Sequence, residues 1–414
     1  MEKKRTILVG QSGGPTCAIN ASLAGVIAKA RSEGAHVLGM RYGIEGLLKR
    51  RIVDLDEKVP TAQALKELAL TPASYLGSCR YKLPDPAADE APYQTLFGLF
   101  AELGVDAVFY IGGNDSMDTI AKLAAYGAER KSPIRFVGVP KTIDNDLMGT
   151  DHTPGYGSAA KFVATAVGEL ARDASVYDLK SVLVVEIMGR DAGWLAASAA
   201  LASSPELPTP DMILLPEAPQ TLDAIAGKAS ELLETRNTVL IAASEGVRDV
   251  SGKLLCEAGS GAVAKDAFGH EVALSGTCRY LASELKSRLG VKGRGVELST
   301  LQRAATHCAS KTDLDEAFSL GAAGVAAAFE GKTGIMCTIE RVSSLPYRTK
   351  IGTIAISEVA NAERTVPPEM IAADGMGVTD AFIRYARPLI EGAVHLFEVD
   401  GVPHRLPALD PGRC

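Results

Sequence analysis

Ile134-Arg135-Phe136-Val137-Gly138-Val139 is a short apolar run, and it leads directly into Pro140-Lys141-Thr142-Ile143-Asp144-Asn145-Asp146. The apolar run predicts a buried strand, and the proline and the Asp-Asn-Asp triplet after it predict a loop. In open α/β sheets, ligands bind beyond the carboxyl ends of the strands, where such a loop lies. This stretch therefore indicates an α/β fold with a polar site at the end of the strand.

The same alternation of short apolar runs and helical patterns continues along the chain. Further strands are expected at 7–9, 105–111, 182–187, 212–215 and 239–243, and helices at 19–32, from the 112–116 loop up to 126, at 194–202, 223–234, 280–289 and 379–385. Near-continuous apolar strands between helices are typical of parallel sheets with helices on both faces. The sequence therefore predicts an α/β protein with mostly parallel sheets.

A chain of 414 residues is unusually long for a domain built on one sheet, so we expect two doubly wound lobes. Residues 1–150 are expected to form the first lobe, with an insertion or lid at about 54–92, and residues 151–345 the second. Residues 346–414 are expected to form a C-terminal segment that packs back on the lobes.

The composition excludes several classes of protein. Hydrophobic residues make up 47% and charged residues 22%, which is typical of a packed globular protein. The net charge of −7 argues against a general affinity for nucleic acid or an anionic membrane. The seven cysteines form no C-x-x-C pair, so neither a zinc site nor a disulfide framework is indicated. The sequence shows no signal-peptide core and no membrane-spanning apolar run, and a cytoplasmic location is expected.

Three loops carry the polar residues expected at a binding site. Ser12-Gly13-Gly14 and Gly112-Gly113-Asn114-Asp115-Ser116 each precede a helix, where backbone N–H groups can approach an anion; a tight turn without a ligand is the alternative. In the third loop, Asp144 and Asp146 stand two residues apart beside Lys141. This spacing suits magnesium coordination or a general base near a phosphate, and a turn with solvated acids is the alternative.

Four motifs occur in order: Gly-Gly-Asn-Asp-Ser at 112–116, Pro-Lys-Thr-Ile-Asp-Asn-Asp at 140–146, Val-Glu-Ile-Met-Gly-Arg at 185–190 and Gln302-Arg303. In this order and spacing they resemble the phosphofructokinase superfamily, over about residues 5–390. The resemblance implies the phosphofructokinase fold and phosphoryl transfer to a sugar phosphate.

The resemblance also implies a role for each matching residue. Asp144 matches the general base that takes the proton from the C1 hydroxyl of fructose 6-phosphate, and Thr142 matches a residue that binds the transferred phosphoryl group. Sugar-binding positions are matched by Asp146, Met188, Gly189, Arg190 and Glu245, and 6-phosphate positions by Arg294 and Arg303. Donor-phosphate positions are matched by Gly13, Gly14, Arg80 and Ser116, and Mg²⁺ positions by Asn114 and Asp146.

Two residues bear on the identity of the phosphoryl donor. In ATP-using members the second-loop motif resembles Gly-Gly-Asp-Gly-Ser, and a glycine precedes Thr-Ile-Asp-Asn-Asp. This chain has Asp115 in place of the second-loop glycine and Lys141 in place of the other. In having both residues, the chain resembles the pyrophosphate-dependent members of the family. A carboxylate at 115 would repel the α-phosphate of ATP, and an ammonium at 141 suits a short, dense anion. The alternatives are an acid at a helix N-terminus and a solvated lysine.

Other positions depart from the family pattern. Asn114 stands where aspartate is usual, and an amide oxygen coordinates magnesium with less charge. The family also uses an arginine from a neighbouring subunit, about nine residues before Arg190; Ser181 stands there, with Lys180 beside it as a substitute. Ala24 replaces an effector-binding arginine, which argues against nucleotide regulation.

The expected activity is therefore reversible phosphoryl transfer from pyrophosphate to the C1 hydroxyl of fructose 6-phosphate, with Mg²⁺. The resemblance implies a homodimer or homotetramer with shared active sites. The alternatives are an ATP-dependent 6-phosphofructokinase and a noncatalytic sugar-phosphate-binding subunit. Glycine patterns at 155–160, 259–264 and 331–333 are weak signals for a dinucleotide or a P-loop.

Overall fold

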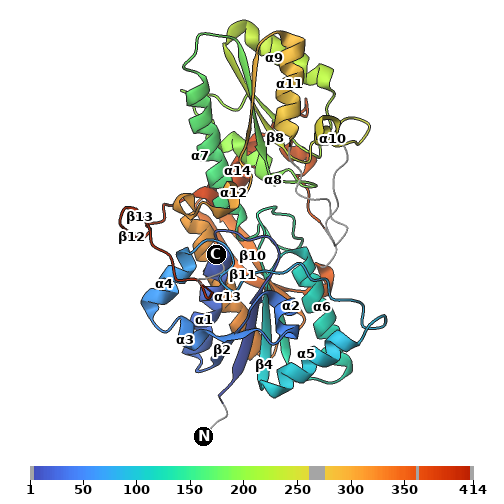
Figure 1. Ribbon diagram of the computed structural model, residues 1–414, viewed down its shortest axis with the longest axis vertical. Helices are drawn as coiled ribbons and strands as arrows, with labels where there is room; N and C mark the ends of the chain where they lie inside the picture. The colour runs from blue at the N-terminus through green and yellow to red at the C-terminus, as the bar shows by residue number, and fades with distance from the viewer. Residues whose placement is uncertain (1–3, 261–275, 360–362, 411–414) are drawn as a thin grey trace.

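The structure is a computed structural model, and it describes residues 4–260, 276–359 and 363–410. These residues form two α/β lobes, one above the other in Figure 1. The first lobe contains a seven-stranded sheet and the second a four-stranded sheet. Both sheets are mostly parallel, so the predicted fold class is confirmed.

The first sheet has the strand order β11-β10-β5-β4-β1-β2-β3. Its strands are β1 (Thr6–Gln11), β2 (His36–Met40), β3 (Ile52–Asp54), β4 (Val105–Gly112), β5 (Arg135–Pro140), β10 (Ile335–Ser344) and β11 (Tyr347–Ala355). The pairings are parallel except at the two edges, where β3 runs antiparallel to β2 and β11 antiparallel to β10. The carboxyl ends of β1, β4 and β5 therefore lie side by side, with their three polar loops.

Helices cover both faces of this sheet. Successive side chains of a strand point to opposite faces, so alternate residues enter two different cores. Ile7 and Val9 of β1 belong to the core with α1 (Ile19–Ser32) and α13 (Lys311–Phe329). Leu8, between them, belongs to the core with α2 (Gly43–Leu48), α5 (Ala91–Glu102) and α6 (Asn114–Glu129). β1 is buried on both sides, which explains its unbroken apolar sequence.

The second sheet has the order β7-β8-β6-β9 and is parallel throughout. Its strands are β6 (Ser181–Ile187), β7 (Met212–Leu214), β8 (Thr238–Ser244) and β9 (Lys292–Glu297). Leu183 of β6 belongs to the core with α7 (Tyr156–Ala174), α8 (Trp194–Ala197) and α14 (Asp380–Ala386). Val184 belongs to the core with α9 (Leu222–Thr235) and α11 (Thr277–Leu289). Helices thus cover both faces of this sheet as well.

The chain returns to the first lobe earlier than we expected, so the range 151–345 is wrong as the extent of the second lobe. Helix α13 packs closely on α1, where a Cβ added at Gly25 would lie 2.0 Å from the Phe318 carbonyl oxygen. Strand β10 extends the first sheet, with Met336 opposite Gly138 of β5. The buried apolar residues of β10 explain this placement, because joining the first sheet removes them from water. Hydrophobic periodicity alone does not tell which sheet a strand joins.

The segment at about 54–92 lies against the end of β1. It contains α3 (Leu55–Lys58) and α4 (Ala62–Leu70), followed by irregular chain. The Leu76 amide donates to Gln11 Oε1 at 2.9 Å, and Ser78 Oγ donates to the Gly13 carbonyl at 2.6 Å. The segment therefore forms one wall of the polar loops.

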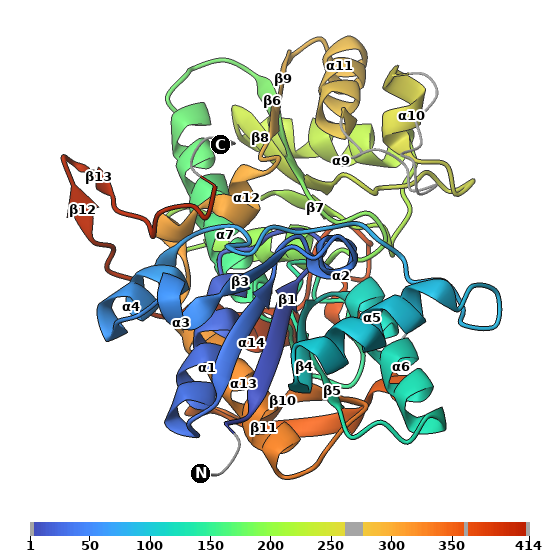
Figure 2. The ribbon, with the colours of Figure 1, turned by 60° about the horizontal axis from the view of Figure 1, so that its bottom comes forward.

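The remaining α-helices and strands are short. They are α10 (Leu255–Ser260), α12 (Leu301–Ala304), β12 (Glu398–Val399) and β13 (Val402–Pro403), the last two forming a hairpin that projects from the body in Figure 2. Within the described residues, no helix has both the length and the hydropathy needed to cross a membrane.

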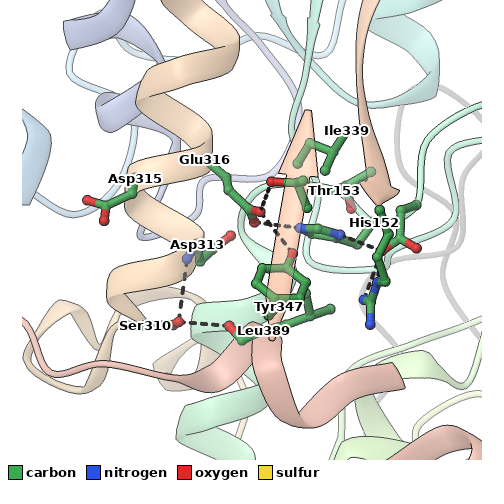
Figure 3. A network of polar contacts seen from close by, with 12 residues as sticks. His152, Thr153, Ser310, Asp313, Asp315, Glu316, Ile339, Tyr347 and Leu389 are labelled. Carbon is green, nitrogen blue, oxygen red and sulfur yellow. Dashed lines mark hydrogen bonds and ion pairs between the residues drawn. The ribbon is translucent and has the colours of Figure 1, made fainter. Parts of the chain in front are cut away.

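A buried ionic cluster lies between α13 and the segment that enters α7 (Figure 3). His152 is 1% exposed, and its two ring nitrogens lie 2.8 Å from Asp151 Oδ2 and 2.7 Å from Glu316 Oε2. Arg341 of β10 donates to the same Asp151 carboxylate, and Tyr347 of β11 donates to Glu316. Because both ring nitrogens face carboxylates, both donate, and His152 is an imidazolium. Burial opposes this charge, but the bonds to Asp151 and Glu316 raise the pKa of His152 to about 9.

We expect this cluster to make stability depend on alkaline pH. A histidine pKa raised from 6.5 to about 9 stabilises the fold fully below pH 6.5, and this contribution is lost as the pH rises through 9. Between these limits the wild type should lose on the order of 3 kcal/mol of unfolding free energy relative to His152→Asn. Urea unfolding of both proteins at several pH values measures the difference. The control is His36→Asn, which removes a half-exposed histidine paired with Asp54; an equal pH dependence in wild type and His152→Asn would contradict the assignment.

Candidate active site

The loops after β1 and β4 meet each other and the 76–80 segment. Gly13 has a φ of 75°, which favours glycine, and its amide donates to the Cys79 carbonyl at 3.4 Å. The hydroxyls of Ser12 and Ser116 are hydrogen-bonded to each other. A Cβ added at Gly112 would lie 1.8 Å from Ser116 Oγ, so this position accepts only glycine. The two glycine loops predicted from the sequence therefore form one surface.

Lys141 links the β5 loop to this surface. Its side chain is only 2% exposed, and its Nζ donates to the Gly14 carbonyl at 2.6 Å. Burial lowers the pKa of Lys141 to about 8, although the nearby Asp144 and Asp146 favour its charged form. The alternative of a solvated lysine is therefore wrong, and the ammonium is a fixed charge within the loops.

Asp144 lies beside this lysine. Thr142 Oγ1 donates to Asp144 Oδ2 at 3.1 Å and accepts the Asp144 amide at the same distance. Burial raises the pKa of Asp144, while the Thr142 hydrogen bond and the positive charges of Lys141 and Arg303 act against the rise. A half-buried carboxylate held by one hydroxyl and facing two cations is suited to accept a proton. The alternative of a solvated turn does not describe this residue.

Asp146 pairs with Asn114 across the loops. Asn114 Nδ2 donates to Asp146 Oδ2 at 2.9 Å, and the Asn114 Oδ1 atom is buried without a hydrogen-bond partner among the described residues. Burial, and next the negative charge of Asp144, raise the pKa of Asp146 to about 7. Asp115, the next residue of α6, is exposed on its first turn. The Asn114 amide and the Asp146 carboxylate therefore lie side by side, with Asn114 Oδ1 buried.

The second lobe contributes the loops after β6 and β8. The Met188 amide donates to Gln302 Oε1, and the Gly189 amide, at a φ of 139°, donates to Glu245 Oε1, both at 3.3 Å. Burial raises the pKa of Glu245 to about 7; the Gly189 hydrogen bond opposes this rise, the charge of Asp144 adds to it, and Arg190 favours the carboxylate. The structure therefore brings the predicted 188–190 and 245 positions together.

Arg303 connects the two halves of the site. A Cβ added at Gly14 would lie 3.2 Å from Arg303 Nη1, so the guanidinium reaches the first loop. Burial lowers the pKa of Arg303 and the charge of Arg80 lowers it further, whereas Asp144 and Glu245 favour the charged form. Arg80 is exposed and lies close enough to Arg303 to act on its pKa. Lys141 and Arg303 thus lie close enough to Asp144 to act on its pKa, and Arg80 lies beside Arg303.

Two predicted residues lie elsewhere. Arg294 is in the middle of β9, opposite Leu183, and its exposed guanidinium pairs with Asp173 at 3.0 Å. The structure therefore does not bring Arg294 to the cluster formed by Arg303. Lys180, the substitute expected from a neighbouring subunit, donates to the Leu233 and Arg236 carbonyls and lies outside the site of its own chain.

The weak glycine patterns have structural explanations. Gly155 precedes α7, but the Asp313 carboxylate accepts the amides of Gly155 and Ser158, so the start of this helix is already capped. Gly331 follows the end of α13 with a φ of 93°, which is a helix terminus and not a phosphate loop. The pattern at 259–264 lies mostly outside the described residues.

Sequence reasoning missed three residues that hold the Asp144–Asp146 loop. Asn145 is buried with a φ of 57°, Arg364 donates to its carbonyl, and Tyr385 accepts its side-chain amide. The Asp-Asn-Asp triplet could have indicated a left-handed residue at 145, because asparagine tolerates that conformation. No signal in the sequence links Arg364 or Tyr385 to this loop.

A two-lobed α/β fold with a buried lysine, two carboxylates and a bridging arginine at its strand ends defines an enzyme built for phosphoryl transfer. Residues 6–327 match the phosphofructokinase family, and the chain belongs to that family. The resemblance inferred from the motifs is confirmed.

Individual relatives match nearly the whole chain. The pyrophosphate–fructose 6-phosphate 1-phosphotransferase of Xanthomonas campestris is 42% identical over 400 residues, covering 96% of this chain and 94% of the relative. The Methylococcus capsulatus protein of the same name is 38% identical over 404 residues, with the same coverage. The crystal structure of a pyrophosphate-dependent phosphofructokinase from Nitrosospira multiformis superposes with a TM-score of 0.87 at 37% identity, covering 96% of this chain and 95% of that one.

Proposed function

We propose that the protein transfers a phosphoryl group from pyrophosphate to the C1 hydroxyl of fructose 6-phosphate, giving fructose 1,6-bisphosphate and phosphate. The observation that carries this proposal is the buried Lys141 ammonium, held against Gly14 between the glycine loops and Asp144. It occupies the place where ATP-using members have glycine, and it supplies a fixed positive charge to a compact anion. The names of the two relatives support the same donor and acceptor. Pyrophosphate and sugar esters have comparable transfer potentials, so the reaction is reversible.

Asp144 is the general base of the proposed reaction. It accepts the proton of the C1 hydroxyl as the C1 oxygen forms a bond to phosphorus and the bridging P–O bond of pyrophosphate breaks. Lys141 and Arg80 are proposed to contact the phosphates of pyrophosphate and to offset their negative charge, and Arg303 adds positive charge beside Asp144. Phosphoryl transfer needs this alignment and charge neutralisation and no covalent nucleophile. Thr142 orients the carboxylate and, in our proposal, also contacts the transferred group.

The residues around Asp146 fit a magnesium ion. The Asp146 carboxylate, whose pKa is raised, accepts the Asn114 side-chain amide, and Asn114 Oδ1 is buried without a hydrogen-bond partner among the described residues. Carboxylate and amide oxygens are the ligands that Mg²⁺ prefers, so Asp146 and Asn114 are the proposed ligands. When bound, the ion supplies positive charge to the phosphate oxygens.

The sugar is proposed to bind to the second lobe. Glu245 lies close enough to Asp144 and Arg190 for both charges to act on its pKa, and the Met188 and Gly189 amides are held by Gln302 and Glu245. The 6-phosphate is proposed to contact Arg303 in its own chain. Arg294 points outward from β9, so it could reach a sugar phosphate only in another copy, consistent with a proposed homodimer or homotetramer. The described cysteines are free thiols, which supports a proposed cytoplasmic location.

The purified chain should form fructose 1,6-bisphosphate from fructose 6-phosphate, pyrophosphate and Mg²⁺ without any other protein. A coupled assay measures this reaction, and light scattering on the same preparation gives the number of copies. The reverse reaction, started with fructose 1,6-bisphosphate and phosphate, should release pyrophosphate. Substrate binding without turnover in either direction would instead favour the noncatalytic subunit.

A further inference from the structure

The loop that carries Asp144 and Asp146 closes on itself around one side chain. Thr142 and Gly155 form a backbone bridge at its base, where Thr153 Oγ1 also donates to the Thr142 carbonyl at 3.0 Å. Arg364, more than 200 residues further along the chain, inserts its guanidinium into this loop. One cation from a distant segment therefore fills the loop that carries both acids.

All five N–H donors of Arg364 are used. Nε and Nη2 donate to the Asn145 carbonyl at 3.2 and 3.0 Å, and Nη2 also donates to the Tyr385 hydroxyl at 3.2 Å. Nη1 donates to the carbonyls of Thr150 at 3.2 Å and Asp151 at 2.6 Å. The planar guanidinium thus joins the two arms of the loop, which the three donors of a lysine on one nitrogen cannot do.

The same residue ties the loop to the second lobe. The Arg364 amide donates to the Asp146 carbonyl at 2.7 Å, and its carbonyl accepts Trp194 Nε1 at 2.9 Å. Its guanidinium lies 4.6 Å from the centre of the Trp194 ring, which belongs to the core of the second lobe. The loop of the first lobe is therefore fixed against the lobe that we propose binds the sugar.

Asn145 needs such support because of its conformation. Its φ of 57° is in the left-handed region, which asparagine tolerates better than other residues with a side chain but which its neighbours must still hold in place. Its side chain donates to the Tyr385 hydroxyl at 2.8 Å and accepts the Thr153 amide at 3.0 Å. A rotation of this one residue would change the directions of Asp144 and Asp146 relative to each other.

We propose that Arg364 is a positioning residue for phosphoryl transfer: its guanidinium holds the Asn145 main chain so that the Asp144 and Asp146 carboxylates keep their places. This inference rests on the proposed function. Among the described residues, the Arg364 guanidinium donates to backbone carbonyls and the Tyr385 hydroxyl and to neither carboxylate, so it acts through the loop backbone. A displacement of about 1 Å in a reacting group is enough to cost up to about 100-fold in rate.

The test is Arg364→Ala, assayed with pyrophosphate and fructose 6-phosphate. We expect kcat to fall by about 10-fold to 100-fold while each KM changes by less than about threefold, because the loop and not the binding groups is altered. Millimolar ethylguanidinium should restore part of kcat by refilling the loop. Arg364→Lys should remain impaired, since an ammonium cannot join both arms. If Arg364→Ala does not fold, Tyr385→Phe, which removes the shared hydroxyl, should lower kcat in the same way.

Arg341→Ala is the matched control. Arg341 is likewise partly buried and donates to Asp151 and to the Tyr385 carbonyl, but its hydrogen bonds to described residues include none to 144–146. It should lower thermal stability and leave kcat within about threefold of wild type. The inference is overturned if Arg364→Ala keeps the wild-type kcat, if its kcat falls no further than that of Arg341→Ala, or if only its KM values rise. An inactive wild type would instead overturn the proposed function.

Discussion

Asp144→Asn should lower kcat by at least about 100-fold, with the KM for fructose 6-phosphate changed by less than about threefold. The substitution keeps the shape of the side chain and its hydrogen bond with Thr142, but an amide cannot accept the proton of the C1 hydroxyl. The fall is expected in kcat and not in KM, because the proton is transferred only in the transition state. Steady-state kinetics in both directions measure it, since the same group must return the proton in the reverse reaction.

The control for this variant is a second buried carboxylate outside the site. Asp211→Asn changes a side chain whose pKa is also raised by burial, and which accepts the Leu240 amide in the second lobe. It should reduce stability without changing kcat. Near-wild-type turnover of Asp144→Asn would remove Asp144 from the role of general base and leave the site without a proton acceptor at that position.

Pyrophosphate should support turnover at least about 100-fold faster than ATP at pH 7, because unfavourable charge contacts cost several kcal/mol. At this pH Lys141, with a pKa of about 8, is mostly an ammonium and can neutralise a pyrophosphate oxygen. Asp115 stands exposed at the start of α6, where it would meet the additional phosphate of ATP. The double variant Asp115→Gly and Lys141→Gly should lose most of this preference, measured as the ratio of kcat/KM for the two donors.

Single variants distinguish the effect of side-chain charge on donor choice from the effect of side-chain volume. Lys141→Met keeps the volume of the buried side chain and removes its charge, so it should slow the pyrophosphate reaction without admitting ATP. Asp115→Asn keeps the shape of the side chain and removes its repulsion of ATP, so it should raise kcat/KM for ATP and leave kcat/KM for pyrophosphate unchanged. A wild type that turns over faster with ATP would contradict the assigned donor and favour the ATP-dependent alternative.

Local patterns in the sequence were sufficient for the parts of the fold and site that depend on neighbouring residues. Helix 19–32 and the strand before Lys141 were predicted closely, because their apolar periodicity is also their burial pattern. The loop acids were recognised because they follow a strand end directly. Lys141 was predicted as charged, but its burial follows from Gly14 and Arg303, which are far away in sequence.

Features that depend on distant contacts could not be predicted. The return of β10 to β5 depends on which sheet has an open edge, and Arg364 fills a loop more than 200 residues before it. The outward direction of Arg294 follows from the pleat of β9 and its pairing opposite Leu183. A spacing of nine residues between Arg294 and Arg303 carries no information about that geometry.

The chain crosses between the lobes at α13, β10 and α14, and this path decides whether a fragment of the chain can fold by itself. A fragment ending near residue 150 would lack the helix that covers α1 and the strand beside β5, and a fragment ending near 345 would lack the helix that closes the core of β6. Neither half of the gene encodes a self-sufficient folding unit. Recombination between relatives should therefore preserve function only when it exchanges the interleaved segments together.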